Sequence, residues 1–321
     1  MSVATAIVPT GRGGPRLARL LESLRGQSRL VEVIVVANDV PDSGLSGIQT
    51  EEHVRVIRLP QNVGYGRAVN LAAGEARGDA IIVLNDDCRC EPGFVEAMVA
   101  ALEPATGVTM AAGLMLDHRD PSRVDTAGIE IGRGLLAFDY LNGEPVVAVE
   151  RGVPDPLGPS GAAAAFDARA FQAAGGFDEN LFAYWEDVDL ALRMRLAGGR
   201  CRLAVTARGV HEHSATLGSG SARKNYLMGF GRGYVLKKWG VLADPRRLVA
   251  ALAADTVICA GQAVIDRNLA GVRGRFSGFR AARRAHAYPG AVIDGQARVP
   301  GLIADLRRRR RRRARLARAA A

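Results

Sequence analysis

Two acidic clusters have the residue types and the setting for catalysis with a metal ion. Asp86 and Asp87 directly follow the apolar run Ala80 to Leu84, so their carboxylates are expected where a buried strand ends and a ligand can reach them. A hard divalent cation takes such oxygen ligands and often shares them with substrate phosphates. Glu186 and Asp187, in the second cluster, provide a carboxylate that can act as a base. Together the clusters predict an enzyme with a metal-bound diphosphate leaving group and a carboxylate that activates an incoming hydroxyl.

Each cluster also has a purely structural interpretation. Asn85-Asp86-Asp87 is typical of a turn or a helix cap, because Asn and Asp side chains hydrogen-bond to their own backbone. Glu186, Asp187 and Asp189 fit the first turn of a helix through Leu190 to Leu196, where the helix dipole favours negative charge. Neither cluster alone separates these interpretations from the catalytic one.

The elements around the first cluster favour the catalytic interpretation. Apolar runs predict strands over Ala4 to Thr10, Val31 to Val36, Val54 to Leu59 and Ala80 to Leu84, with helices over Arg16 to Leu24 and from Asn70 toward Gly78. This alternation predicts an α/β fold with a mostly parallel, Rossmann-like sheet and helices on both faces. Its ligand crevice lies at the carboxyl ends of the strands, where the polar clusters of the chain fall.

A glycine-containing segment follows the third expected strand. Asn62 to Asn70 supplies Gly64 and Gly66, which let the backbone approach a ligand, and Arg67, which can reach a phosphate or a sugar. The same glycine pair also suits an ordinary tight turn between a strand and a helix.

Five separated motifs resemble, in their order, those of family 2 glycosyltransferases with the GT-A fold. They are Ile7-Val8-Pro9-Thr10, Val33-Ile34-Val35-Val36, Asn62-x-Gly64-x-Gly66-x-x-x-Asn70, Leu84-Asn85-Asp86-Asp87, and Gly175 to Glu179 followed by Trp185-Glu186-Asp187-Val188-Asp189 and Arg193. The resemblance covers about residues 3 to 240. It implies a catalytic domain over 1–240, with a nucleotide-sugar half at 1–100 and an acceptor half at 101–240.

The resemblance implies roles for the acidic residues. Asp87 would be the metal-binding member of the Asp-x-Asp motif, and Asn85 stands where the first aspartate often is. Asp86 or the donor diphosphate would then complete the shell around Mg²⁺ or Mn²⁺. Asp187 would be the general base of an inverting transfer, and Glu186 would orient the acceptor or the helix.

The resemblance also implies a set of donor-binding residues. They are Pro9, Thr10, Asn38, Asp39, Asn62, Gly64, Arg67, Asn70 and Asp86. Relatives usually carry an aspartate directly after the second strand to hold a pyrimidine base. This chain has Ala37-Asn38-Asp39 there, so Asn38 or Asp39 is expected to take that role.

Two histidines, His211 and His213, fall on one face of a possible later strand. Their spacing can suit zinc, but no partner set of Cys or His accompanies them, and they can also be ordinary surface histidines. In the resembled family a histidine here completes the metal site or contacts the diphosphate. We favour His211 over His213 for this role.

Excess positive charge lies in the last quarter of the chain. Residues 241–321 hold 18 arginines and five aspartates, a net charge of +13, whereas residues 1–240 hold 25 basic and 28 acidic residues. Such a segment is attracted to anionic lipid by about 1 kcal/mol per basic residue near the surface. Leu248 to Ile265 is apolar at helical spacing but contains Asp255 and Gln262, which favours a helix at a membrane surface over one that spans it.

The basic tail has two other interpretations. The run Arg307 to Arg313 can be a solvated disordered end, which we expect over residues 305–321, or it can bind nucleic acid without sequence preference. Specific nucleic-acid binding is not expected, because the chain shows no known nucleic-acid fold and the tail has few aromatic residues for stacking.

A narrower resemblance, to rhamnosyltransferases of actinobacterial cell-wall assembly, implies the substrates. It is carried by Leu84 to Cys88, His211 to Thr216 and Asp266 to Gly274. It implies transfer of L-rhamnose from dTDP-rhamnose to an N-acetylglucosaminyl diphosphate polyprenol. A protein with this acceptor is expected at the cytoplasmic face of the cell membrane, as a peripheral protein.

Three alternative functions remain open at this stage. A glycosyltransferase with another donor, such as a galactofuranosyl or hexosyl donor, would use the same motifs. A nucleotidyltransferase would need a basic glycine-rich signature near the first strand, which Gly11 to Gly14 offers only faintly. A nonenzymatic sugar-nucleotide or lipid-surface binding protein would tolerate the loss of Asp187. The four cysteines show no disulfide framework, which is expected of a reduced, cytosol-facing protein.

Overall fold

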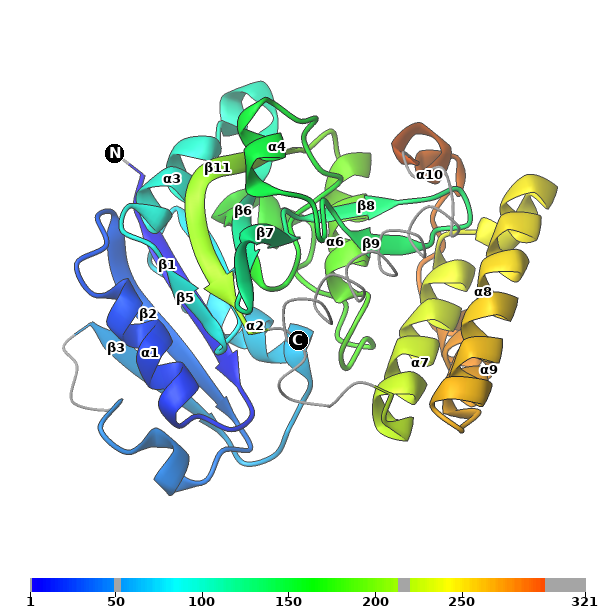
Figure 1. The fold of residues 1–321 in the computed structure, drawn as a ribbon, viewed down its shortest axis with the longest axis horizontal. Helices are drawn as coiled ribbons and strands as arrows, with labels where there is room; N and C mark the ends of the chain where they lie inside the picture. The colour runs from blue at the N-terminus through cyan, green and yellow to red at the C-terminus, as the bar shows by residue number, and fades with distance from the viewer. Residues whose placement is uncertain (1, 49–52, 213–219, 298–321) are drawn as a thin grey trace.

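A single large sheet organises the first two thirds of the chain (Figure 1). The computed structural model describes residues 2–48, 53–212 and 220–297, so His213 and the segment 305–321 lie outside the described residues. The strand order is β3-β2-β1-β4-β10-β6-β11-β5, and β7 also pairs with β6. This arrangement is the GT-A fold expected from the sequence, with a helical C-terminal region beside it.

The first four strands match the expected ones closely. They are β1 (Ala4–Thr10), β2 (Leu30–Asn38), β3 (Val54–Leu59) and β4 (Ala80–Leu84). β1 pairs in parallel with both β2 and β4, and β2 pairs in parallel with β3. Both faces of β1, β2 and β4 are buried, which explains their nearly continuous apolar runs, whereas the edge strand β3 is only half-buried and carries Arg55 and Arg58.

Alternate side chains of β1 enter two hydrophobic clusters on opposite faces of the sheet. Ala6 and Val8 pack in one cluster with the helices α1 (Pro15–Leu24) and α3 (Phe94–Ala101). Ile7 packs in the other cluster with α2 (Tyr65–Ala73) and α6 (Glu186–Leu196). The two layers of helices leave the carboxyl ends of the parallel strands at one edge of the sheet.

The second half of the sheet is mixed in direction. Its strands are β5 (Cys88–Cys90), β6 (Val108–Asp117), β7 (Asp120–Thr126), β10 (Ala163–Asp167) and β11 (Arg200–His211). β10 is antiparallel to β4 and β6, and β11 is parallel to β6 but antiparallel to β5. The pairing of β11 with β5 sets His211 opposite Cys88, beside the acidic end of β4. The sheet is therefore parallel only in its first half and around β6 and β11.

Smaller elements complete the chain before the C-terminal helices. A short hairpin is formed by β8 (Ile129–Ile131) and β9 (Ala137–Asp139). The short helices are α4 (Val146–Glu150) and α5 (Ala168–Ala173). Asp167 caps α5, because its side chain accepts a hydrogen bond from the Ala170 amide.

The basic C-terminal segment is helical where the structure describes it, as expected. Four helices stand to the right of the sheet in Figure 1: α7 (Ala222–Lys238), α8 (Pro245–Ile265), α9 (Ala270–Ala281) and α10 (Ala291–Gln296). Glycines let α9 lie directly on α7, and a Cβ added at Gly278 would come within 1.9 Å of the Phe230 carbonyl oxygen. The segment 241–297 thus packs onto the catalytic body through α7.

Candidate active site

A cavity of about 580 Å³ opens at the carboxyl ends of β1, β2 and β4. The start of α6, the end of β11 and the first turns of α7 close its other sides. It gathers ten of the fourteen residues predicted for the site, namely Pro9, Thr10, Asn38, Asn62, Gly64, Asp86, Asp87, Glu186, Asp187 and His211. Of the other four, Asp39, Arg67 and Asn70 do not line it, and His213 lies outside the described residues.

Asp87 and His211 face each other at the wall of this cavity. The His211 Nε2 atom lies 3.1 Å from the Asp87 Oδ1 atom, and both side chains are nearly buried. On its other side His211 meets Asp125, with 2.8 Å between Nδ1 and the Asp125 Oδ2 atom. Burial opposes a charge on the imidazole, but the contacts with Asp125 and Asp87 outweigh it and raise the pKa of His211 to about 10.

This group suits a divalent cation. Asp87 offers a carboxylate oxygen and His211 a ring nitrogen, and a carboxylate behind a metal-binding histidine fixes its tautomer and orientation. The Cys88 thiol lies in the same cluster, but burial raises its pKa well above the usual value and it donates to the Ala162 carbonyl. The thiol does not line the cavity, whereas Asp87 and His211 do. These two residues therefore fit the ion, which on binding would take the place of the proton that His211 Nε2 holds toward Asp87.

Asp86 is held by the first strand. Its Oδ2 atom accepts a short hydrogen bond from the Thr10 hydroxyl, which in turn accepts one from the Gly13 amide at 2.8 Å. Burial and the charge of Asp87 together raise the pKa of Asp86 despite that hydrogen bond. Asp86 therefore ties the loop after β1 to the end of β4, next to the proposed ion ligands.

Asn38 organises the part of the cavity at the end of β2. Its Oδ1 atom accepts from the Val63 amide at 2.9 Å, and its Nδ2 atom donates to Asn62 Oδ1 and to the Gly64 carbonyl, both at 3.2 Å. Gly64 has a φ of 91°, and a Cβ there would lie 2.6 Å from the Phe182 carbonyl oxygen, so only glycine fits. Asp39 is exposed, has a φ of 66° and is not among the residues that line this cavity.

Two predicted donor contacts are not supported by their positions. The Arg67 side chain is 55% exposed, and its nearest carboxylate is that of Glu179 at 3.6 Å. Asn70 uses both ends of its amide on the backbone of Phe177, with two hydrogen bonds of 2.9 Å. Both residues lie on the side of α2 that faces the turn Gly175–Glu179 and do not line the cavity, so their donor contacts stay a prediction.

Glu186 and Asp187 begin α6 and both line the cavity. The two residues before them, Tyr184 and Trp185, have φ values of 70° and 75°, a conformation that non-glycine residues adopt mainly where the surrounding structure enforces it. Asp187 Oδ2 accepts from the Gly161 amide at 3.2 Å, and the Tyr65 hydroxyl donates to the Gly161 carbonyl at 2.7 Å. Gly161 thus connects Tyr65 of α2 to the predicted base Asp187, through its carbonyl and its amide.

The environment of this pair favours proton transfer near neutral pH. Burial raises the pKa of Asp187 to about 6. Burial and the charge of Asp187 raise the pKa of Glu186 to about 8. The Glu186 Oε2 atom is buried with no hydrogen-bond partner among the described residues. Two carboxylates with pKa values near neutrality in one cavity can accept a proton from a bound hydroxyl.

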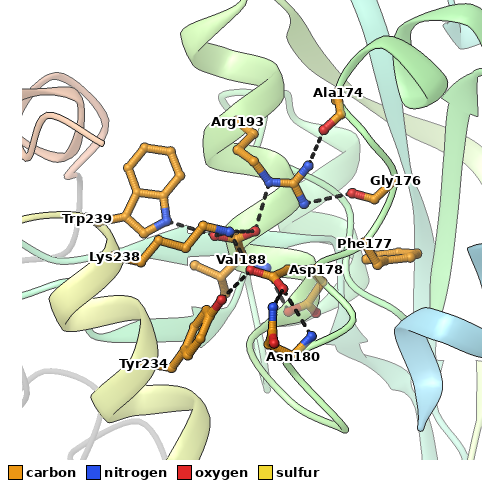
Figure 2. A network of polar contacts seen from close by, with 12 residues as sticks. Ala174, Gly176, Phe177, Asp178, Asn180, Val188, Arg193, Tyr234, Lys238 and Trp239 are labelled. Carbon is orange, nitrogen blue, oxygen red and sulfur yellow. Dashed lines mark hydrogen bonds and ion pairs between the residues drawn. The ribbon is translucent and has the colours of Figure 1, made fainter. Parts of the chain in front are cut away.

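A buried network of ion pairs and hydrogen bonds links α6 to the end of α7 (Figure 2). Asp189, which is fully buried, accepts hydrogen bonds from Arg193 Nε at 2.8 Å, from Trp239 Nε1 at 2.9 Å and from the Lys238 amine. The same amine lies 2.6 Å from Asp178, whose pKa falls to about 2 because its contact with Lys238 outweighs burial. This network joins α6, the end of α7 and the turn that contains Asp178.

Replacing Lys238 with methionine is expected to lower the free energy of unfolding by about 3–5 kcal/mol, because two buried carboxylates lose their shared cation. Urea denaturation of the full chain measures this change. Lys237→Met, at the exposed neighbouring lysine, is the matched control and should stay within about 0.5 kcal/mol of the parent. Equal losses in both variants would show that the network contributes little.

Asp125 and Tyr65 were not among the predicted site residues. Asp125 lies near the end of β7, and only the pairing of β7 with β6, and of β6 with β11, brings it to His211. No local pattern marks it, because a single Asp near the end of a short hairpin is ordinary. Tyr65 directly follows Gly64 in a motif that the sequence analysis identified. Its place in that motif is the sequence feature that could have indicated it.

Asp125→Asn is expected to weaken Mn²⁺ binding about 10- to 100-fold, because His211 loses the carboxylate that fixes its tautomer. Titration of the protein with Mn²⁺, followed by the electron paramagnetic resonance signal of the free ion, gives the dissociation constant without an activity assay. Asp120→Asn, in the exposed part of the same strand, is the control. Unchanged Mn²⁺ affinity in Asp125→Asn would contradict the role of His211 as a ligand of the ion.

Solved structures with the same fold define the class of protein. GalNAc-T7, solved with UDP, GalNAc and Mn²⁺, superposes with a TM-score of 0.63 at 14% identity, covering 92% of this chain and 56% of that one. A mannosyltransferase from Pyrobaculum calidifontis, in complex with GDP-Man and Mn²⁺, gives 0.53 at 17% identity over 92% and 79% of the two chains. The fold is that of GT-A glycosyltransferases.

Sequence comparison then gives the family. The model of glycosyl transferase family 2 matches residues 5–129. The N-acetylglucosaminyl-diphospho-decaprenol L-rhamnosyltransferase of Mycobacterium tuberculosis is 31% identical over 242 residues, which cover 67% of this chain and 78% of the relative. The uncharacterized glycosyltransferase YwdF of Bacillus subtilis is 28% identical over 71% and 82% of the two chains. The chain belongs to glycosyl transferase family 2 and is a glycosyltransferase.

Proposed function

We propose that this glycosyltransferase moves L-rhamnose from dTDP-rhamnose to an N-acetylglucosamine carried on a polyprenyl diphosphate, in the assembly of a cell-wall linker. The observation that carries the proposal is one cavity lined both by the Asp87 and His211 pair and by the Glu186 and Asp187 pair. The name of the Mycobacterium tuberculosis relative supports L-rhamnose and a polyprenyl diphosphate N-acetylglucosamine acceptor. The dTDP group of the donor is implied by the resemblance of the sequence motifs alone. With this acceptor, we expect a peripheral protein at the cytoplasmic face of the cell membrane.

The proposed mechanism is a single displacement with inversion at the anomeric carbon. Asp187 takes the proton of the acceptor hydroxyl as its oxygen bonds to the anomeric carbon, and the bond from that carbon to the diphosphate oxygen breaks. A divalent ion, Mn²⁺ or Mg²⁺, held by Asp87 and His211 would neutralise charge on the leaving diphosphate. Asn38 and Asn62 hold the loop that faces the nucleotide, and Glu186 orients the acceptor.

Transfer of radiolabelled sugar tests this function. The full chain is supplied with dTDP-rhamnose, UDP-galactofuranose or UDP-glucose and a polyprenyl diphosphate N-acetylglucosamine, with and without Mn²⁺ or Mg²⁺. Labelled lipid only with dTDP-rhamnose and a metal ion is the expected result. Product from another donor would support the mechanism and contradict L-rhamnose as the transferred sugar. A donor that binds while no labelled lipid forms would favour a nonenzymatic sugar-nucleotide binding protein.

The transfer rate is expected to rise with pH through a midpoint near 6. Burial raises the pKa of Asp187 to about 6, and a base acts only when deprotonated, so the rate is lost as pH falls below that value. Initial rates between about pH 5 and 8, at saturating donor and metal ion, give the profile. In Asp187→Asn the same rise should be absent, and a rise that persists there would assign the titration to another group.

A further inference from the structure

The outer face of α8 exposes apolar side chains along the whole helix. We define this outer face by Val249, Leu252, Ala253, Thr256, Val257, Ala260 and Val264, all of them exposed. They recur at helical spacing, so they form one stripe about 20 Å long. Of the twelve large hydrophobic side chains exposed in the described chain, seven lie between Val249 and Phe276. A patch of this kind marks an interaction site.

The one charged residue within this stretch is directed inward. Between Arg247 and Asp266 the only Asp, Glu, Lys, Arg or His residue is Asp255. Its Oδ1 atom lies 3.1 Å from Arg232 Nε and 3.1 Å from Arg275 Nη2, on α7 and α9. The outer face of α8 therefore carries no charge, and the charge of Asp255 is paired within the protein.

These inward contacts oppose a membrane-spanning role for α8. The helix is long and apolar enough to cross a bilayer, with a mean hydropathy of 1.9 over 18 residues. Its inner face is nonetheless anchored, because Arg232 also donates to the carbonyls of Leu135 and Gly134, and a Cβ at Gly134 would lie 2.6 Å from the Ala251 amide. Insertion would separate Asp255 from two arginines and expose its charge to lipid.

Exposed arginines surround the outer face. Arg246 and Arg267 lie at the two ends of α8, and Arg273, Arg280, Arg283 and Arg284 are exposed on α9 and just after it. A helix with an apolar face and cationic surroundings lies in the plane of an anionic bilayer, with its apolar side chains among the acyl chains. Charge and apolarity together thus favour an anionic lipid surface as the partner of this face.

The end of α8 is tied to the active-site cavity. Asp266 and Asn268, just after α8, accept hydrogen bonds from the Asn225 Nδ2 atom at 2.9 and 3.3 Å. Asn225 lies in the first turns of α7, whose Arg223, Lys224 and Met228 line the cavity. Arg232, which pairs with Asp255, also lies over the Trp185 ring, 5.5 Å from its centre. Trp185 directly precedes Glu186 in the sequence. Docking of α8 would therefore set the position of the cavity relative to the bilayer.

We propose that the outer face of α8 lies in the surface of an anionic bilayer, parallel to the membrane plane, and so presents the cavity wall of Arg223 and Lys224 to a lipid-linked acceptor. Only the last step, presentation to the acceptor, rests on the proposed function. The two cations of α7 then meet the diphosphate of an acceptor whose prenyl chain stays in the lipid.

Vesicle flotation of the full chain tests the docking. The vesicles contain equal parts of phosphatidylcholine and phosphatidylglycerol, in about 0.1 M or about 0.5 M NaCl. At the higher salt exposed charges are screened beyond roughly 4 Å, so binding through the arginines alone is lost while burial of the outer face persists. The parent protein is expected to float in both salts, and the double variant Leu252→Glu, Val264→Glu is expected to lose at least about tenfold in partition at the higher salt.

Val147→Glu is the matched control, because Val147 on α4 is as exposed as Leu252, at 56%. It should float like the parent protein. Circular dichroism melting checks that the double variant keeps its fold, since both changed side chains already face solvent. Flotation that disappears for the parent protein at high salt, or that is equal in the double variant, overturns the proposal and leaves the arginines as the lipid or nucleic-acid contact.

A second arm separates this inference from the proposed function. Transfer to a short-chain, water-soluble diphosphate acceptor should be the same in the parent protein and the double variant, whereas transfer to acceptor embedded in vesicles should fall about tenfold in the variant. Equal transfer from vesicles by both proteins contradicts the presentation of the acceptor. Flotation without transfer to either acceptor would contradict the proposed function alone.

Discussion

Replacing Asp187 with asparagine is expected to lower kcat for sugar transfer by about 10³-fold while donor affinity stays within about twofold. The amide keeps the shape of the carboxylate and can still accept the Gly161 amide hydrogen through its oxygen, but it takes up no proton. Single-turnover rates and the dissociation constant of the donor, measured on one preparation, separate the two effects. Glu179→Gln, at an exposed carboxylate on a nearby turn, is the control and should leave both quantities unchanged.

The neighbouring Glu186 provides the sharper comparison. Its Oε2 atom has no hydrogen-bond partner among the described residues, and its pKa is raised more than that of Asp187. We expect Glu186→Gln to raise the KM for the acceptor more than it lowers kcat, because Glu186 orients the acceptor. The reverse result, a nearly inactive Glu186→Gln beside an active Asp187→Asn, would make Glu186 the base.

Replacing Asp87 with alanine is expected to weaken Mn²⁺-dependent donor binding by about 100-fold, which corresponds to about 3 kcal/mol. The ion would lose its carboxylate ligand, while His211 would keep its contact with Asp125. Calorimetric titration of the donor with and without Mn²⁺ gives the metal-dependent part of the affinity. Asp42→Ala, at a side chain that is 95% exposed, serves as the control. A metal effect of the same size in Asp87→Ala and in the parent protein would move the ion site to other residues.

The parallel half of the fold could be predicted because its information is local. The apolar runs of β1, β2 and β4 form neighbouring strands inside the sheet, so the strand ends that lead to Thr10, Asn38 and Asp86 follow from the sequence. The parallel order then brings those ends to one edge, which is why most of the predicted residues share one cavity.

The errors and omissions have equally specific causes. Arg67 and Asn70 belong to a motif that contributes Gly64 and Tyr65 to the cavity, but α2 turns them toward the Phe177 turn. Asp39 lies one residue beyond β2, where a φ of 66° directs the chain away. Asp125 and Lys238 act through contacts between segments at least 49 residues apart in sequence, such as Lys238 with Asp189, which no pattern within one segment can reveal.

The anomeric configuration of the product tests the central claim most directly, which is a single inverting displacement with Asp187 as the base. The product of the active donor, formed by the full chain with Mn²⁺, is purified and its one-bond carbon–hydrogen coupling at the anomeric position is measured by NMR. An inverting displacement gives a product with the configuration opposite to that of the donor, and this is the expected result. A product that retains the configuration of the donor would contradict the single displacement and the role assigned to Asp187.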